Sequence, residues 1–256
     1  PSYNAISVAS NGKIYYVLSS ASIDTGAQLY CFDPKTSEIS HMADLTCAIG
    51  ERSLRAIPQG KSHVRFTEAN GKLYFATHVS YYRSEDGLEA LGVPPPEYAA
   101  YPGGHFLALD LSTHCIEDII LPVSGQGILA MAMDVCRNRL YGITWPNGVF
   151  VAYDIDSGSL STAPVSGKGE AGRAADYRVV CRALVVSPED GTVYLTLSDG
   201  RIVRYHHDRD ALEVVRGDTM RKDYFGSYDP TSPWNMAYHW RQAIWHPAEK
   251  VVYGVH

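Results

Sequence analysis

Residues 61–78 read KSHVRFTEANGKLYFATH, and the Asn-Gly pair in the middle of this stretch decides the fold. Asn70 and Gly71 separate two short runs in which apolar and polar residues alternate. Asn-Gly in this setting is a strong short-range signal for two antiparallel strands joined by a two-residue turn. The stretch therefore predicts a β-hairpin, with Tyr74 in its second strand.

The same combination of a turn and a following tyrosine recurs along the 256-residue chain. The five copies are NGKIYYV at Tyr15, NGKLYFAT at Tyr74, RNRLYGIT at Tyr141, DGTVYLTL at Tyr194 and AEKVVYGV at Tyr253. Successive tyrosines are 59, 67, 53 and 59 residues apart. An apolar run precedes Tyr74 and each later tyrosine, and after each of the first four a further apolar strand runs into a turn and another strand. The repeat unit is therefore four short antiparallel strands.

Tandem units of four antiparallel strands indicate an all-β fold, the β-propeller, whose blades surround a central channel. We expect one partial propeller domain over 1–256, with blades at about 1–45, 61–122, 126–164, 178–216 and an incomplete one at 238–256. An unclosed propeller leaves unpaired strand edges. We therefore expect the remaining blades of a seven- or eight-bladed propeller, or a partner chain, to complete these four and a half blades.

The composition of the chain excludes some classes of binding partner. The formal net charge is −6 and no basic run occurs, which argues against nucleic acid because phosphate binding needs clustered Lys and Arg. No apolar stretch is long enough for a membrane span. The five cysteines are widely spaced, and we interpret most of them as buried apolar side chains, leaving one disulfide open.

The long connections fall on one face of the predicted propeller. They are residues 46–61, 79–103, 165–177 and 217–238, all rich in residues that order loops or bind ligands. Loops of this length in a compact domain are usually functional. We therefore expect the ligand site at this face, around the mouth of the channel.

Two histidines lie at this face. If Asn70 and Gly71 are the two turn residues, paired residues sum to 141, so His63 and His78 are directly opposed and about 5 Å apart at Cβ. They are either a polar cross-strand pair, an acid/base pair, or part of a Zn²⁺ or Mn²⁺ site. Candidates for a third ligand are His105, His246, His256 and Gln242.

Two arginines are predicted at the same rim. Arg182 and Arg241 both lie twelve residues before a repeat tyrosine. They either bond loop carbonyls or clamp an anionic ligand. Flat side chains on which sugars can stack are Tyr81, Tyr82, Tyr98, Tyr101, Trp145, Trp234 and Tyr238.

The segments GKLYFATH, PGGHFLALD and WRQAIWHPAEKVVYG resemble bacterial propeller proteins related to polysaccharide lyases, in particular the oligogalacturonate-lyase and ulvan-lyase families. The resemblance implies His, Tyr and Arg at the channel mouth, a bound divalent metal (Zn, Mn or Ca), and β-elimination of an anionic, uronic-acid-containing polysaccharide. A lyase of this kind is expected in the periplasm or outside the cell.

β-Elimination needs a cation for the carboxylate, a base for the C5 proton and an acid for the leaving oxygen. On this reading the catalytic residues are Arg182 and Arg241 for the carboxylate, His63 or His78 as base, and Tyr177 or Tyr238 as acid. The predicted substrate-binding residues are His105, Trp145, Gln242, Tyr81, Tyr82 and Trp234. The predicted metal-binding residues are His246, His256 and Gln242.

Two other functions stay open. A non-catalytic propeller can use the same mouth to bind a glycan or a protein. A metal-dependent hydrolase or lactonase needs acidic residues near the mouth, for which the sequence offers Glu170 and Asp176.

Overall fold

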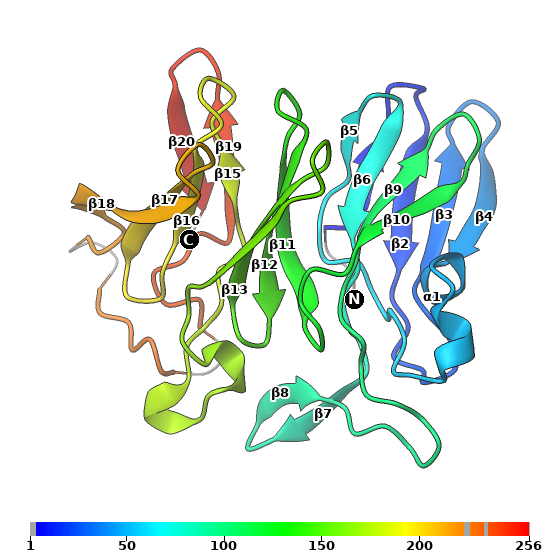
Figure 1. Cartoon of the computed structure of the whole chain (residues 1–256), viewed down its shortest axis with the longest axis horizontal. Helices are drawn as coiled ribbons and strands as arrows, with labels where there is room; N and C mark the ends of the chain where they lie inside the picture. The colour runs from blue at the N-terminus through cyan, green and yellow to red at the C-terminus, as the bar shows by residue number, and fades with distance from the viewer. Residues whose placement is uncertain (1–3, 223–225, 233–234, 256) are drawn as a thin grey trace. The chain divides into compact units, whose positions relative to one another are not determined.

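The computed structural model describes residues 4–222, 226–232 and 235–255, and its strands form two compact units, Pro1–Ile128 and Leu129–His256. The described residues contain four sheets of four antiparallel strands, one two-stranded sheet, and one separate hairpin (Figure 1). This arrangement confirms the predicted all-β propeller architecture of four-stranded blades, with about four and a half blades in the chain.

The first unit holds two of the four-stranded sheets. The strands of the first follow chain order: β1 (Ile6–Val8), β2 (Ile14–Leu18), β3 (Gln28–Asp33) and β4 (Glu38–Asp44). Two short helices follow, α1 (Leu45–Ala48) and η1 (Glu51–Leu54). The second sheet has β5 (Thr67–Ala69), β6 (Lys72–Ala76), β9 (Phe106–Asp110) and β10 (Ile116–Ile120). The hairpin of β7 (Tyr82–Glu85) and β8 (Leu88–Leu91) is an insertion between β6 and β9.

The second unit continues the same pattern. Its first sheet comprises β11 (Gly127–Asp134), which begins at the unit boundary, β12 (Arg139–Trp145), β13 (Val149–Asp154) and β14 (Leu160–Pro164). The short helices η2 (Gly169–Ala171) and η3 (Ala174–Asp176) lead to β15 (Val185–Val186), β16 (Val193–Thr196), β17 (Arg201–His206) and β18 (Ala211–Thr219). The two-stranded sheet is β19 (Gln242–His246) with β20 (Val251–Val255).

The Asn70-Gly71 turn forms as predicted. Ala69 pairs with Lys72 and Thr67 with Tyr74, so paired residues sum to 141. Asn70 has φ 51° and Gly71 φ 74°, the two positive values that a type I′ turn requires. Asn tolerates this backbone better than most residues with a Cβ, and Gly has none to clash.

Asn11-Gly12 and Asp190-Gly191 lead to the same expectation of a two-residue turn in the first and fourth sheets, but both turns are longer. Ala9 donates its N–H to the carbonyl of Lys13, which leaves a three-residue loop around Asn11-Gly12. In the fourth sheet Ser187 donates to the carbonyl of Thr192, which leaves four residues between them. An Asx contact explains the first case, because the Asn11 side chain accepts the N–H of Lys13 and favours a turn one residue wider.

Repeat tyrosines and their neighbours form the core of each unit. Tyr15, Tyr74 and Tyr141 are buried, whereas Tyr253 is 53% exposed on the two-stranded sheet. In β6 and β9 consecutive residues are buried, which means that both faces of these inner strands are covered. Tertiary packing, rather than the alternation of a one-sided sheet, therefore determines burial in these strands.

The cysteines differ from the expectation. All five are free thiols, and only Cys31 and Cys181 are buried. The other three, Cys47, Cys115 and Cys136, are exposed because they lie in a helix or in turns at the ends of strands. The interpretation of most cysteines as buried was wrong. Among the described residues, no helix is long and apolar enough to cross a membrane.

Candidate functional site

His63 and His78 lie side by side, but not in the predicted pairing. β5 begins only at Thr67, and beyond it Lys61 takes the place opposite His78, with N···O distances of 2.9 and 2.7 Å for their two backbone hydrogen bonds. The pairing sum changes from 141 to 139. A shift of two residues keeps the side chains on the same face. The His63 and His78 rings accordingly meet edge to face, with centroids 6.0 Å apart.

Two further side chains complete this group. The Tyr82 hydroxyl lies 3.4 Å from His78 Nε2 and donates a 2.8 Å hydrogen bond to the carbonyl of Val79. The Lys61 ammonium lies 4.8 Å from the centre of the Tyr82 ring, a cation–π distance. We call Lys61, His63, His78 and Tyr82 the histidine cluster. The sequence did not single out Lys61, whose place followed from the register shift.

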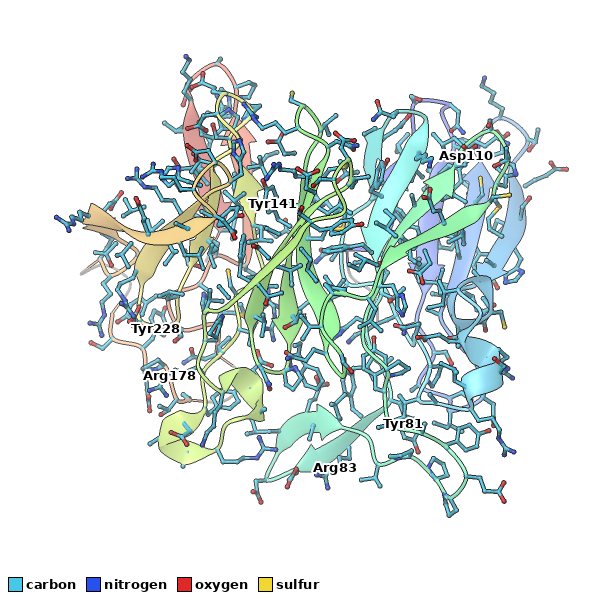
Figure 2. The ribbon with its side chains drawn as sticks, in the orientation of Figure 1. Tyr81, Arg83, Asp110, Tyr141, Arg178 and Tyr228 are labelled. Atoms are coloured by element: carbon cyan, nitrogen blue, oxygen red, sulfur yellow. The ribbon has the colours of Figure 1, made fainter. Side chains whose placement is uncertain are left out.

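Burial divides the cluster into inner and outer members. His78 is 1% and Lys61 9% exposed, whereas His63 and Tyr82 are half-buried and reach the surface. Gly127 makes room for His78, because a Cβ at this position would lie 1.8 Å from His78 Nδ1. A cation, two imidazoles and a phenol thus converge at the end of β6 opposite the Asn70-Gly71 turn, beside the β7–β8 hairpin (Figure 1). Figure 2 shows Tyr81 and Arg83 at this end of the unit and Asp110 at the other.

His105, predicted to bind substrate, is held by protein carboxylates. Its Nδ1 lies 2.8 Å from Asp118 and its Nε2 3.0 Å from Glu51. Burial disfavours the charged ring, but the hydrogen bonds to Asp118 and Glu51 outweigh it and raise the His105 pKa to about 9. Glu51 also accepts from Gln59, 2.8 Å away. His105 therefore ties η1 to the second sheet.

Arg182 and Trp145 meet in the second unit, and both bind Glu170. Arg182 lies 2.6 Å from one Glu170 oxygen, and Trp145 Nε1 donates to the other at 2.8 Å. Burial opposes the charge of Glu170, yet the Arg182 guanidinium leaves the carboxyl pKa below its ordinary value. Arg182, which was predicted to bind an anionic ligand, therefore already binds the Glu170 carboxylate. The sequence had suggested Glu170 only as a residue of a hydrolase.

Tyr177 and Tyr238, proposed as acids, are both buried. The Tyr238 hydroxyl accepts the N–H of Tyr228 at 3.1 Å, and the Arg221 guanidinium lies 5.2 Å from the centre of its ring. These contacts occupy the hydroxyl and one face of Tyr238. Arg241 is exposed at the start of the two-stranded sheet.

The predicted metal ligands do not gather. Gln242 and His246 begin and end β19, pairing with Val255 and Val251, so about 13 Å of strand separates them. Trp234 and His256 lie outside the described residues. Within 4–222, 226–232 and 235–255, no three His, Cys, Asp or Glu side chains are placed to hold a metal ion.

Comparisons with known proteins identify the fold and not the activity. No family model and no curated protein matches the chain. Among solved structures, the extracellular domain of BT4673 from B. thetaiotaomicron, described as a one-component system, matches with a TM-score of 0.50 and 14% identity over 94% of this chain and 25% of that one.

Two further matches are more distant. TolB from Acinetobacter baumannii has a TM-score of 0.45 and 12% identity over 85% of this chain and 44% of its own. A luciferin-regenerating enzyme has a TM-score of 0.49 and 13% identity over 94% of this chain and 64% of its own. The chain therefore spans less than two thirds of each of these proteins. The class that the fold defines is a β-propeller of four-stranded blades.

Proposed function

We propose that this propeller binds an anionic, uronic-acid-containing polysaccharide at the histidine cluster and cleaves it by β-elimination. The observation that carries the proposal is the convergence of Lys61, His63, His78 and Tyr82 from the two segments that flank one hairpin. The cluster brings a cation, a base and a phenolic acid to one place. It uses residues of the first unit only.

Each step of the elimination has a candidate group. The Lys61 ammonium neutralises the uronate carboxylate, which acidifies the proton on C5. Half-buried His63 takes that proton, and the electron pair forms a C4=C5 double bond as the C4–O bond breaks. Tyr82 gives its phenolic proton to the departing oxygen once its hydroxyl turns away from the Val79 carbonyl, to which it donates at 2.8 Å. His78 is too buried to meet a polymer, and it positions Tyr82 and His63 from below.

This scheme differs from the expectation in its carboxylate group. Arg182 is already neutralised by Glu170 at 2.6 Å, so its guanidinium is a poor clamp for a second carboxylate. Because the described residues offer no group of three metal-binding side chains, the scheme includes no step through a Zn, Mn or Ca ion. Glu170 is likewise held by Arg182 and Trp145, which disfavours a hydrolase mechanism built on it.

The test is direct. The protein is incubated with polygalacturonate, ulvan, alginate and glycosaminoglycans, and the ultraviolet absorbance of unsaturated uronides is followed. We expect turnover on one substrate, lost in His63→Ala and kept in His41→Ala. His41 is a matched control, since its ring also contacts an aromatic ring, Tyr30, at 5.2 Å but lies on β4 away from the cluster. No absorbance on any substrate overturns the proposal.

A non-catalytic glycan-binding propeller is the second candidate. It is favoured by the hydrogen bond from the Tyr82 hydroxyl to the Val79 carbonyl, because this bond engages the proton that the elimination needs. Equilibrium binding separates the two. A binding module retains a measurable Kd for the polyuronate and produces no unsaturated product, and His63→Ala then changes the affinity alone.

A further inference from the structure

A polar cavity of about 220 Å³ lies in the second unit, between the sheet of β11–β14 and the sheet of β15–β18. The two sheets contact each other here through aromatic rings, with Tyr205 4.9 Å from Phe150 and 5.9 Å from Tyr141 between centroids. The lining comes from the start of β12, from the end of β13 and the turn after it, from the start of β14, and from the end of β17 and the turn after it. Figure 2 shows Tyr141 toward the other end of this unit from Arg178 and Tyr228.

Hydroxyl groups and aromatic rings dominate the lining. Ser157, Ser159 and Ser161 contribute small hydroxyls, and Tyr153 and Tyr205 contribute phenol rings. Side chains of this kind donate and accept hydrogen bonds with equal ease. Aromatic faces add apolar surface against which the C–H groups of a ligand can pack.

The charged side chains of the lining leave one carboxylate in excess. Arg139 pairs with Asp154 at 2.7 Å. Asp210 accepts hydrogen bonds from Ser161 and, at 2.7 Å, from Tyr205. One arginine and two aspartates leave no surplus positive charge for an anion, and both carboxylates keep lone pairs that can accept further hydroxyl protons. With one carboxylate in excess, this lining disfavours an anion and suits a ligand rich in hydroxyl donors.

Tyr141 provides an independent sign of a ligand. It is fully buried and lines the cavity, and its hydroxyl makes no hydrogen bond of standard geometry among the residues that the structure describes, although the Arg139 side chain lies close enough to act on its pKa. Other repeat tyrosines differ, since Tyr15 accepts from Asn11 and Tyr253 donates to Glu249. A buried hydroxyl without a partner is unfavourable. Burial raises the Tyr141 pKa to about 12, so the group carries its proton and can donate it to a ligand.

We propose that this cavity binds a single neutral sugar ring, with hydroxyls to the carboxylates, the serines and Tyr141, and its apolar face on Tyr153 or Tyr205. The volume of about 220 Å³ is below the 300–1,000 Å³ typical of sites for drug-sized ligands, which limits the occupant to one ring. The site shares no residue with the histidine cluster. The proposed sugar site can therefore be tested independently of the proposed lyase activity.

Binding is measured by calorimetry and ligand-observed NMR on the intact chain. The probes are D-glucose, D-galactose and D-mannose, with D-galacturonate as anionic and D-glucosamine as cationic comparators. We expect one neutral hexose to bind and Asp154→Asn to weaken it about tenfold, the effect of losing one good hydrogen bond. Tyr141→Phe should weaken the same sugar without lowering the melting temperature, because it removes only the unpartnered hydroxyl.

Asp110→Asn is the matched control. Asp110 and Asp154 hold the same place in their blades, and each accepts backbone N–H bonds from the turn that follows it, but Asp110 belongs to the first unit and does not line the cavity. This variant should bind the hexose as the parent does. The proposal fails if no neutral hexose binds, if galacturonate or glucosamine binds more tightly, or if Asp110→Asn weakens binding as much as Asp154→Asn. Should Asp154→Asn not fold, an unchanged affinity in Tyr141→Phe also overturns it.

Discussion

Lys61, and not His63, stands opposite His78: their backbones exchange two hydrogen bonds, and the hairpin register there is two residues away from that set by the Asn70-Gly71 turn. The displacement brings the Lys61 ammonium beside the histidines, where the sequence had predicted Arg182 and Arg241 as the cations. It also keeps His63 beside His78, because side chains in a strand repeat every two residues.

The role of Lys61 can be tested without turnover. In a His63→Ala background, Lys61→Met keeps most of the apolar stem and removes the charge. If the ammonium binds the uronate carboxylate, the affinity for polygalacturonate falls about tenfold or more, measured by calorimetry. Lys13→Met is the control, since Lys13 pairs with Asp33 at 3.4 Å in the first sheet. Equal affinity in both variants would remove Lys61 from the site.

His105 predicts a pH dependence of stability. Its pKa is about 9 in the folded protein against 6.5 for a free imidazole, so folding favours the charged form. The stabilisation is complete below pH 6.5 and disappears as the pH rises through 9, a change of about 3 kcal/mol. Urea unfolding of the parent and of His105→Gln between pH 6 and 10 measures it. The difference between the two proteins should shrink with rising pH, and a constant difference contradicts the linkage.

Gly127 should be intolerant of a side chain because of His78. A Cβ would lie 1.8 Å from His78 Nδ1, so Gly127→Ala should lower the free energy of unfolding by about 1–3 kcal/mol through overpacking. The double variant with His78→Ala tests the cause. In that background the alanine should cost much less, and an unchanged cost would mean that another contact is responsible.

The buried pair in the second unit should matter for stability. Glu170→Gln leaves Arg182 without its counter-charge, and breaking a largely buried pair in this way costs about 3 kcal/mol. Glu97→Gln is the comparison, because its pair with Arg55 is exposed and is worth about 1 kcal/mol or less. Chemical denaturation of the two variants compares the values. Equal losses would show that the protein does not depend on the Glu170–Arg182 charge pair.

The local pattern predicted much of the fold. Asn-Gly turns, alternating strands and the spacing of five tyrosines were sufficient for four-stranded antiparallel blades, because hairpins form between neighbouring segments and depend on local backbone preferences. Loop lengths were less accurate. The Asn11 side chain widens its turn through a contact with the Lys13 N–H that residue type alone does not reveal.

The candidate site was predicted only in part. His63 and His78 are neighbours, as the hairpin geometry indicated. Lys61 was missed because β5 is only three residues long. The register of residues 61–66, which precede β5, depends instead on tertiary packing, including the space that Gly127 leaves for His78. The sequence signal for a change of register is the long insertion at residues 79–103, which directly follows the second strand of this hairpin.

The sequence by itself thus determined the four-stranded blades, because the formation of each hairpin depends only on nearby turn residues and on the alternation of apolar residues. Only the tertiary structure decided the partners of the charged side chains. Arg182 binds Glu170, His105 binds Glu51 and Asp118, and Lys61 lies over Tyr82. These contacts join residues up to 54 positions apart. A buried charge needs a partner, and the packing of the sheets determines which oppositely charged or aromatic group lies close enough to be that partner.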